Sequence, residues 1–282
     1  MENRRTFIKQ VAAAGIISGM PSAFYSQDES IRLIVRGDDM GKNYGRTMGF
    51  MKSYNEGIMT AASIMATSVY FNESVRFCKE NPNMCAGIHL TLVDESQRPV
   101  LSPEEVPSLV NPKGFFYERA EDRPNFSMEE MEKEIRAQIG KARSMGLNFV
   151  YLDNHRSGGE DSIIKKICKE QKLVYGRDYE GEIYGYLKLS LMREKWPSQV
   201  LPDGSKAYYA APAMVEEEKQ LFYDNLSALK PGKWITVVHP GWADPNRAST
   251  TKLLCSPKTK EIIQKKNIQL VSFKDLWEEE YG

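Results

Sequence analysis

The chain has 282 residues, enough for one large α/β domain or two small ones, and it can bury a sizeable core without disulfide bonds. Hydrophobic residues make up 41% and charged residues 27%, a globular composition that excludes a long disordered block. The 38 Lys and Arg residues equal the 38 Asp and Glu residues, so the basic surplus of a typical nucleic-acid-binding protein is absent. We therefore expect no nucleic-acid partner.

The first 26 residues have the features of a cleaved export signal. A charged start is followed by an apolar stretch and by small residues around Pro21. The run that begins at Arg4 and Arg5 resembles a twin-arginine signal, which carries folded proteins across a bacterial inner membrane. The alternative is an amphipathic first helix of the domain. We expect a signal peptide at 1–26, one domain at 27–282, and a periplasmic or secreted protein without membrane contact after cleavage.

From Ile31 onward, short apolar runs alternate with amphipathic stretches. In the first part of the chain this pattern predicts strands at 31–36, 60–66 and 85–92, with helices at 43–56 and 72–80. Residues 96–126 hold five prolines and little periodicity, and we expect an irregular excursion there. Ser127 is followed by Glu130 at the spacing of a capping box, which predicts a helix start.

The second part of the chain continues the alternation. It predicts strands at 148–153, 234–239 and 268–273 and helices at 161–171, 214–229 and 257–266, whereas 173–213 has no clear pattern. Such alternation implies parallel strands with crossover helices. No glycine-rich dinucleotide motif follows the first strand. We therefore predict an incomplete or distorted TIM-like (β/α) barrel of about seven parallel strands rather than an open doubly wound sheet.

The four cysteines are scattered and form no C-x-x-C pair, so a structural zinc knuckle is not expected. Cys78 and Cys85 are close enough in sequence to form a disulfide in an oxidising compartment. The alternative is that Cys78, Cys85, Cys168 and Cys255 are buried small apolar residues.

Acidic residues and all three histidines of the chain fall near the ends of predicted strands. The positions are Asp38 and Asp39, His89, Asp153 and His155, and His239. The carboxyl ends of barrel strands meet on one face, where active sites lie. Taken singly, the aspartates could cap a helix, His89 could be a core histidine, His155 a surface residue and His239 part of a turn. Together, two histidines and a carboxylate form a set of three ligands that leaves a catalytic metal open to water.

Several motifs, in order, resemble the YdjC-like carbohydrate deacetylases, which include chito-oligosaccharide and hopanoid-associated deacetylases. They are the first strand ending in Asp38-Asp39-Met-Gly, the strand starting at Thr60, Gly87-Ile-His89-Leu-Thr-Leu, the turn at Pro107 with Gly114-Phe-Phe, and His239-Pro-Gly-Trp. The resemblance covers about residues 31–275. It implies an incomplete barrel and one divalent metal ion, Mg²⁺ or Zn²⁺, held by Asp39, His89 and His155.

The third motif departs from the family pattern. The family has Asp-x-His-x-His, whereas this chain reads Asp153-Asn-His-Arg-Ser157, so only the first histidine is present. His155 is therefore the expected third ligand, and the change at Arg156 and Ser157 raises the alternative of an altered substrate pocket.

The resemblance implies removal of N-acetyl groups from amino sugars or oligosaccharides. In this reaction, we expect Asp38 to be the base, His239 the acid, and Asp153 to orient a ligand histidine. The alternatives are another metal-dependent hydrolase acting on esters or phosphoesters, and a catalytically weak carbohydrate-binding protein. Whether the chain forms a homodimer is left open. Five aromatic residues in loop-like segments are candidates for stacking on sugars or for local packing: Tyr184, Tyr186, Tyr208, Tyr209 and Trp242.

Overall fold

The computed structural model describes residues 30–189, 198–200, 206–208, 212–242 and 247–282. The predicted export signal lies outside the described residues and stays a prediction, as do any roles of Tyr209 and of the Tyr208 side chain. Among the helices of the described ranges, none has the length and apolar character needed to cross a membrane.

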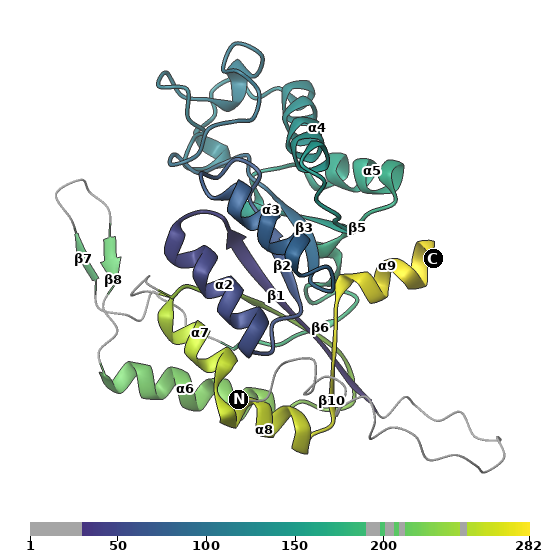
Figure 1. Cartoon of the computed structure of the whole chain (residues 1–282). Helices are drawn as coiled ribbons and strands as arrows, with labels where there is room; N and C mark the ends of the chain where they lie inside the picture. The colour runs from purple at the N-terminus through teal and green to yellow at the C-terminus, as the bar shows by residue number, and fades with distance from the viewer. Residues whose placement is uncertain (1–29, 190–197, 201–205, 209–211, 243–246) are drawn as a thin grey trace.

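One parallel sheet forms the centre of the molecule (Figure 1). Its strands lie in the order β5-β4-β3-β2-β1-β9-β6, and β10 pairs with the first half of β1, beside the point where β2 begins to pair. The strands are β1 (Ile31–Met40), β2 (Ala61–Ile64), β3 (Cys85–Leu90), β4 (Tyr151–Asn154), β5 (Val174–Tyr175), β6 (Gly185–Tyr186), β9 (Gly232–Val238) and β10 (Ile268–Val271). The sheet curls into a half-barrel, which confirms the predicted incomplete barrel.

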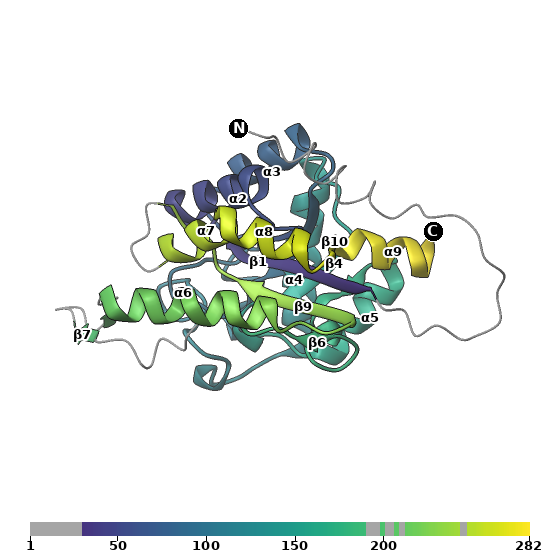
Figure 2. The ribbon, with the colours of Figure 1, turned by 90° about the horizontal axis from the view of Figure 1, so that it is seen from below.

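Helices pack against the curled sheet, as the two ribbon views show (Figure 1, Figure 2). They are α2 (Tyr44–Glu56), α3 (Phe71–Glu80), α4 (Met128–Ser144), α5 (Asp161–Gln171), α6 (Pro212–Ser227), α7 (Ala248–Cys255), α8 (Pro257–Lys265) and α9 (Phe273–Tyr281). Short 3-10 turns occur at η1 (Pro107–Leu109), η2 (Ala120–Asp122), η3 (His155–Ser157) and η4 (Gly176–Tyr179). Two further strands, β7 (Ser198–Val200) and β8 (Lys206–Tyr208), pair with each other in an antiparallel manner.

Most predicted elements are present, several with ends shifted by a few residues, and the short strands β5 and β6 lie in the segment without a clear pattern. Two further differences lie near the carboxyl terminus. The expected strand at 268–273 ends at Val271, because Ser272 and Asp275 form a capping box that starts α9. Helix α7 was not predicted from the sequence at all. Ser127 does cap α4, accepting a hydrogen bond from the Glu130 amide.

The two faces of the sheet have different contents. The outer face contributes alternate residues such as Leu33, Ala62 and Ile88 to the main hydrophobic core under the helices. On the inner face, toward the amino-terminal ends of the strands, lies a second, smaller hydrophobic cluster, in which the ring centres of Tyr151 and Phe273 stack 4.2 Å apart. Phe273, in the first turn of α9, is fully buried in this cluster, which contributes about 1.5–3 kcal/mol to stability. The cluster fills the amino-terminal end of the half-barrel, and we call it the apolar plug.

The inner face becomes polar toward the carboxyl ends of the strands. Because strand side chains alternate with a period of two, positions two and four residues beyond the apolar plug point to the same side. Continuing from Ile34 on β1 leads to Arg36 and Asp38; Cys85 on β3 leads to Gly87 and His89; Tyr151 on β4 leads to Asp153. Gly87 is required here, since a Cβ atom would lie 2.3 Å from the Tyr151 ring. The strand register thus places the predicted site above a closed apolar layer.

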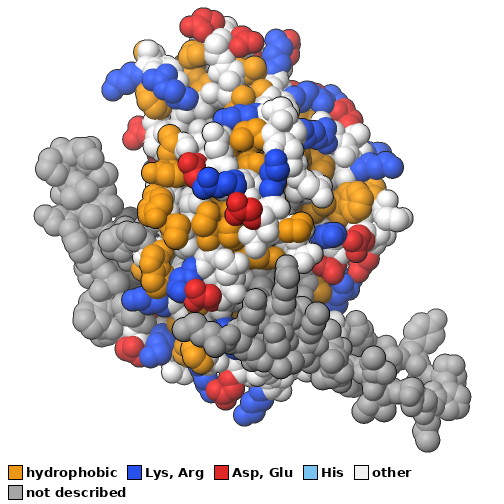
Figure 3. Space-filling view, in the orientation of Figure 1, with side chains coloured by type: hydrophobic (Ala, Val, Ile, Leu, Met, Phe, Trp, Pro, Cys, Tyr) orange, Lys and Arg blue, Asp and Glu red, His pale blue; other side chains and the backbone are white. Residues whose placement is uncertain are grey.

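Acidic and basic side chains are interspersed with hydrophobic ones over the described part of the face in Figure 3. No single sign of charge dominates that face, which matches the balanced composition.

Candidate active site

A cavity of about 340 Å³ opens at the carboxyl ends of β1, β3, β4 and β9. Its lining is strongly charged. The lining residues include all five predicted site residues: Asp38, Asp39, His89, His155 and His239. The structure therefore brings the predicted residues together in one place.

A bulge in β1 directs two neighbouring aspartates into the same cavity. In a regular strand, adjacent side chains point to opposite faces. Here the pairing of β1 with β2 shifts register between Gly37 and Met40, and Asp39 has a left-handed backbone with φ of 75°. Such backbone costs about 1–3 kcal/mol for a residue other than glycine and is concentrated at functional sites. The strain is what allows Asp38 and Asp39 to line one cavity.

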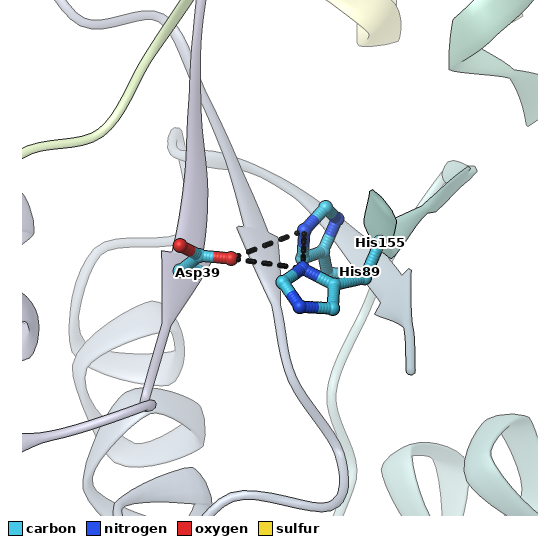
Figure 4. Close-up of side chains that lie close together, drawn as sticks. All are labelled: Asp39, His89 and His155. Carbon is cyan, nitrogen blue, oxygen red and sulfur yellow. Dashed lines mark hydrogen bonds and ion pairs between the residues drawn. The ribbon is translucent and has the colours of Figure 1, made fainter. Parts of the chain in front are cut away.

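Asp39, His89 and His155 form a triangle of potential ligand atoms (Figure 4). Asp39 Oδ1 lies 3.3 Å from His89 Nε2 and 3.1 Å from His155 Nδ1. The two imidazole nitrogens lie 3.1 Å from each other. All three side chains are buried.

This triangle fits a divalent metal ion. Ligand atoms about 2.1 Å from an ion stand roughly 3.0–3.4 Å apart in octahedral or tetrahedral coordination. Asp39 Oδ1 is also a buried oxygen that accepts no hydrogen bond from the described residues, an arrangement that costs free energy unless a cation satisfies it. A second cluster, Asp38, His89 and Asp153, fits less well because Arg36 already binds both of its carboxylates.

Each member of the triangle is held by a partner behind it. His89 Nδ1 lies 2.6 Å from Asp153 Oδ1, and His155 Nε2 lies 3.3 Å from Asp94 Oδ2. The second oxygen of Asp39 is bound by Arg46, from the first turn of α2. A carboxylate behind an imidazole fixes the ring orientation and raises its basicity as a metal ligand. The hydrogen bond of Asp153 agrees with the orienting role predicted for it.

Asp38 is clamped by a buried arginine from its own strand. Arg36 Nε and Nη2 donate to the two oxygens of Asp38 at 2.8 and 3.0 Å. Arg36 also lies 3.1 Å from Asp153 and 2.8 Å from Glu180. Burial raises the pKa of Asp38 above its ordinary value, although Arg36 opposes the shift. A carboxylate with a raised pKa and a fixed orientation is suited to take a proton.

His239 follows β9 and reaches the cavity through a tightly packed turn. Gly49 of α2 packs directly on Gly241, where a Cβ atom would lie 2.4 Å from the Gly241 Cα. The Trp242 amide donates to the Gly45 carbonyl at 2.7 Å. The close approach leaves no room for a side chain on Gly49 where it meets Gly241. Burial lowers the pKa of His239 to about 3, so its imidazole is neutral near pH 7.

The ion-free site holds an excess of negative charge around His89. Burial alone would lower its pKa, but Asp153 and Asp38 outweigh burial and raise the pKa of His89 to about 10. For Asp39, burial is outweighed by the imidazoles of His155 and His89, which hold its pKa well below the ordinary value. The cluster therefore attracts positive charge, whether a proton or a metal ion.

The aromatic candidates divide into different environments. Tyr184 is 1% exposed and packs against Tyr179 and the inner core, so of its two possible roles the structure supports local packing. Tyr186 lines the cavity and is 46% exposed. Trp242 is 45% exposed, with the Lys52 ammonium over its ring. The cysteines are free thiols, three of them buried, so no disulfide joins Cys78 to Cys85.

Several site residues were missed in the sequence. Arg36 carries a signal that could have found it, since a lone charge in an apolar strand, two residues before Asp38, indicates a buried ion pair. Asp94 has a weaker sequence signal, since it is an acidic residue that directly follows the apolar Leu92 and Val93. Its position depends on the irregular segment, whose Tyr117 carbonyl accepts a hydrogen bond from the Asp94 amide at 2.8 Å.

The model of the YdjC-like protein family matches residues 32–265, most of the chain. The chain belongs to the YdjC-like family. This confirms the resemblance seen in the strand-end motifs.

Two relatives show how far the similarity extends. A protein of Brevibacillus brevis named carbohydrate deacetylase is 26% identical over 257 residues, covering 87% of this chain and all of the relative. A carbohydrate deacetylase of Thermoanaerobacter pseudethanolicus is 34% identical over 124 residues, which cover 44% of this chain and 49% of the relative. The crystal structure of an Enterococcus faecalis V583 protein has the same fold as this YdjC-like chain, with a TM-score of 0.66, 24% identity, and coverage of 88% and 99% of the two chains.

Proposed function

We propose that the chain is a metal-dependent deacetylase that removes N-acetyl groups from amino sugars or oligosaccharides. The observation that carries this proposal is the buried triangle of Asp39, His89 and His155 in a cavity at the carboxyl ends of the strands. The relatives named carbohydrate deacetylase support a carbohydrate substrate.

The donor set is one carboxylate oxygen and two imidazole nitrogens. Of the two ions expected, Mg²⁺ and Zn²⁺, imidazole donors favour Zn²⁺. Bound there, a divalent ion would polarise the acetyl carbonyl and lower the pKa of a water molecule. His155 completes the set even though the chain lacks the second histidine of the family motif. The geometry therefore favours an enzyme over a catalytically weak sugar-binding protein.

Asp38 is the proposed base. Arg36 fixes both of its oxygens, so the carboxylate faces the cavity in one orientation and takes the proton of the attacking water at Oδ1 or Oδ2. His239 is the proposed acid. Because its imidazole is neutral at rest, we infer that the proton that Asp38 takes from the attacking water passes to His239 as negative charge develops on the amide, and from His239 to the leaving amine.

The test is acetate release from N-acetylated chito-oligosaccharides by the wild type and by Asp39→Ala and His89→Ala. We expect both variants to lose about a thousandfold in rate or more, since each removes a ligand. Asp224→Ala, which changes an exposed aspartate on α6, is the matched control and should keep full activity. Undiminished activity in both site variants would contradict the metal assignment. Faster hydrolysis of ester or phosphoester substrates than of N-acetyl amides would favour the alternative, a metal-dependent ester or phosphoester hydrolase.

A further inference from the structure

Helix α4 carries two polar side chains that are completely buried. Glu134 and Gln138 are both 0% exposed and lie one helical turn apart. Neither lines the cavity of the candidate active site, and neither has a part in the proposed reaction. A buried carboxylate or amide destabilises a protein unless its polar atoms are hydrogen-bonded. The partners of these two side chains therefore indicate what the polar groups hold in place.

Gln138 holds the backbone directly after β3. Its Oε1 accepts from the Thr91 amide at 3.1 Å, and its Nε2 donates to the Thr91 carbonyl at 2.7 Å. Because a backbone amide can only donate, these contacts also fix which end of the Gln138 amide is the oxygen. Thr91 follows the proposed ligand His89 by two residues, and its hydroxyl donates to the His89 carbonyl at 3.1 Å. Gln138 thus fixes the chain where it leaves the metal triangle.

Glu134 holds the same segment further along the chain. Its two carboxylate oxygens accept from the amides of Val100 and Leu101 at 2.9 and 3.0 Å. Gln138 donates to Glu134 Oε1 at 2.9 Å, so the two buried side chains form one network. Among the described residues Glu134 forms no ion pair, and its direct partners are these three N–H groups. Hydrogen bonds from N–H groups to a carboxylate are stronger than those to a neutral acceptor.

The two points of attachment lie on either side of Asp94. This residue has a φ of 120°, which is strained backbone for a residue other than glycine. Strain of this kind persists where the surrounding structure maintains it. Asp94 Oδ2 lies 3.3 Å from His155 Nε2, and it also pairs with Lys42. The position of a strained residue therefore decides how the proposed ligand His155 is supported.

We propose that Glu134 and Gln138 are positioning residues of the active site, which hold segment 91–101 so that Asp94 meets His155. An apolar helix face would pack α4 against the sheet without the free-energy cost of burying a charge. The polar pair instead ties the segment to a helix at two points. Neither residue belongs to the metal triangle, so an effect on metal binding has to pass through the segment. This inference rests on the metal site of the proposed function.

The test measures Zn²⁺ affinity by competition with a chelating dye. Glu134→Gln keeps the shape of the side chain but sets an NH₂ group against a backbone amide, so the strained Asp94 should lose its fixed position. We expect the dissociation constant for Zn²⁺ to rise about tenfold, since groups behind a metal ligand contribute about 10- to 100-fold to affinity. In a double variant with Asp94→Asn, the loss should be no greater than in Asp94→Asn alone, because both changes act on one contact.

Glu130→Gln is the matched control. Glu130 also lies on α4 and accepts from a backbone amide of the irregular segment, that of Ser108 at 2.7 Å, but this contact is not next to Asp94 in the chain. The variant should leave Zn²⁺ affinity unchanged. Wild-type affinity in Glu134→Gln, an equal loss in Glu130→Gln, or additive losses in the double variant would each overturn the inference while leaving the deacetylase proposal intact.

Hydrogen exchange of the metal-free wild type needs neither a variant nor turnover. The amides of Asp94, Val100 and Leu101 should exchange more slowly than that of Lys113, in an exposed turn of the same irregular segment, by a factor of about ten or more. Exchange as fast as at Lys113 would show that the segment is not held and would overturn the inference. Protected amides in a wild type that binds no Zn²⁺ would support the holding of Asp94, and the proposed metal site alone would fail.

Discussion

The two ends of the half-barrel each carry a cavity, and the larger one is at the end without the candidate active site. The amino-terminal cavity has a volume of about 670 Å³, and its lining includes Cys85, Leu147, Phe149 and Trp277. The carboxyl-terminal cavity is about half that size, yet histidines and carboxylates converge on it. Volume alone would select the wrong end. The convergence of paired titratable groups at the carboxyl ends of the strands selects the other one.

The difference implies that substitutions at the carboxyl-terminal end should change chemistry, and those at the amino-terminal end should change stability. Asp38→Asn is the sharpest case, because the amide keeps the shape and removes the basic oxygen. We expect kcat to fall by about 10²- to 10⁴-fold. Arg36 keeps Asp153 and Glu180 as partners, so the fold should be retained.

Measuring acetate release beside metal content by elemental analysis checks this prediction. Metal content should equal that of the wild type, since Asp38 is not in the ligand triangle. An activity loss that follows metal loss would instead show that Asp38 is a ligand.

At the same carboxyl-terminal end, Asp153→Asn should weaken metal binding, because Asp153 orients the proposed ligand His89. The amide accepts more weakly from His89 Nδ1 and no longer fixes its tautomer, so we expect metal affinity to fall by about 10- to 100-fold. A competition titration with a chelating dye measures it. Asp94→Asn, which changes the support of His155, gives an independent comparison. Unchanged affinity in both variants would mean that the triangle needs no support.

The sequence predicted the triangle more completely than it predicted what supports it. Asp39, His89 and His155 could be predicted from the sequence, because apolar runs locate the strand ends and parallel strands bring their ends together. The position of Asp94 could not be predicted, since it depends on how an irregular segment folds back onto the strand end. The bulge that turns Asp38 and Asp39 to one cavity was equally hidden, because it arises from pairing with β2 and not from local preference.

At the amino-terminal end, Leu147→Ala should lower the free energy of unfolding and leave the reaction unchanged. Leu147 is 5% exposed in the main core, and it borders an open cavity, so the loss should be about 2–3 kcal/mol, the lower part of the range for such changes. Urea unfolding measures the loss. Activity should stay within about twofold at a temperature where the variant is folded.

Lys274→Ala is the control for this cavity. Its ion pair with Glu278 is exposed and 3.9 Å long, so its loss should have little effect on stability. A large loss of activity in Leu147→Ala would contradict the separation of the two ends.

The smallest effect should come from the thiols at the amino-terminal end, and it concerns pH. Burial raises the pKa of Cys85 from 9.0 to about 12, and that of Cys78 likewise to about 12. A thiol with a pKa higher in the folded than in the unfolded chain stabilises the fold fully below about pH 9, and this contribution is lost as pH rises toward about 12. Unfolding followed from pH 8 to 11 should show stability falling, with a shallower slope in Cys85→Ala. Identical slopes would mean that Cys85 ionises as freely in the folded chain as in the unfolded one. The rate at which Cys85 is alkylated at pH 8 is a second measure of its burial, and we expect it to be slower in the folded than in the denatured chain.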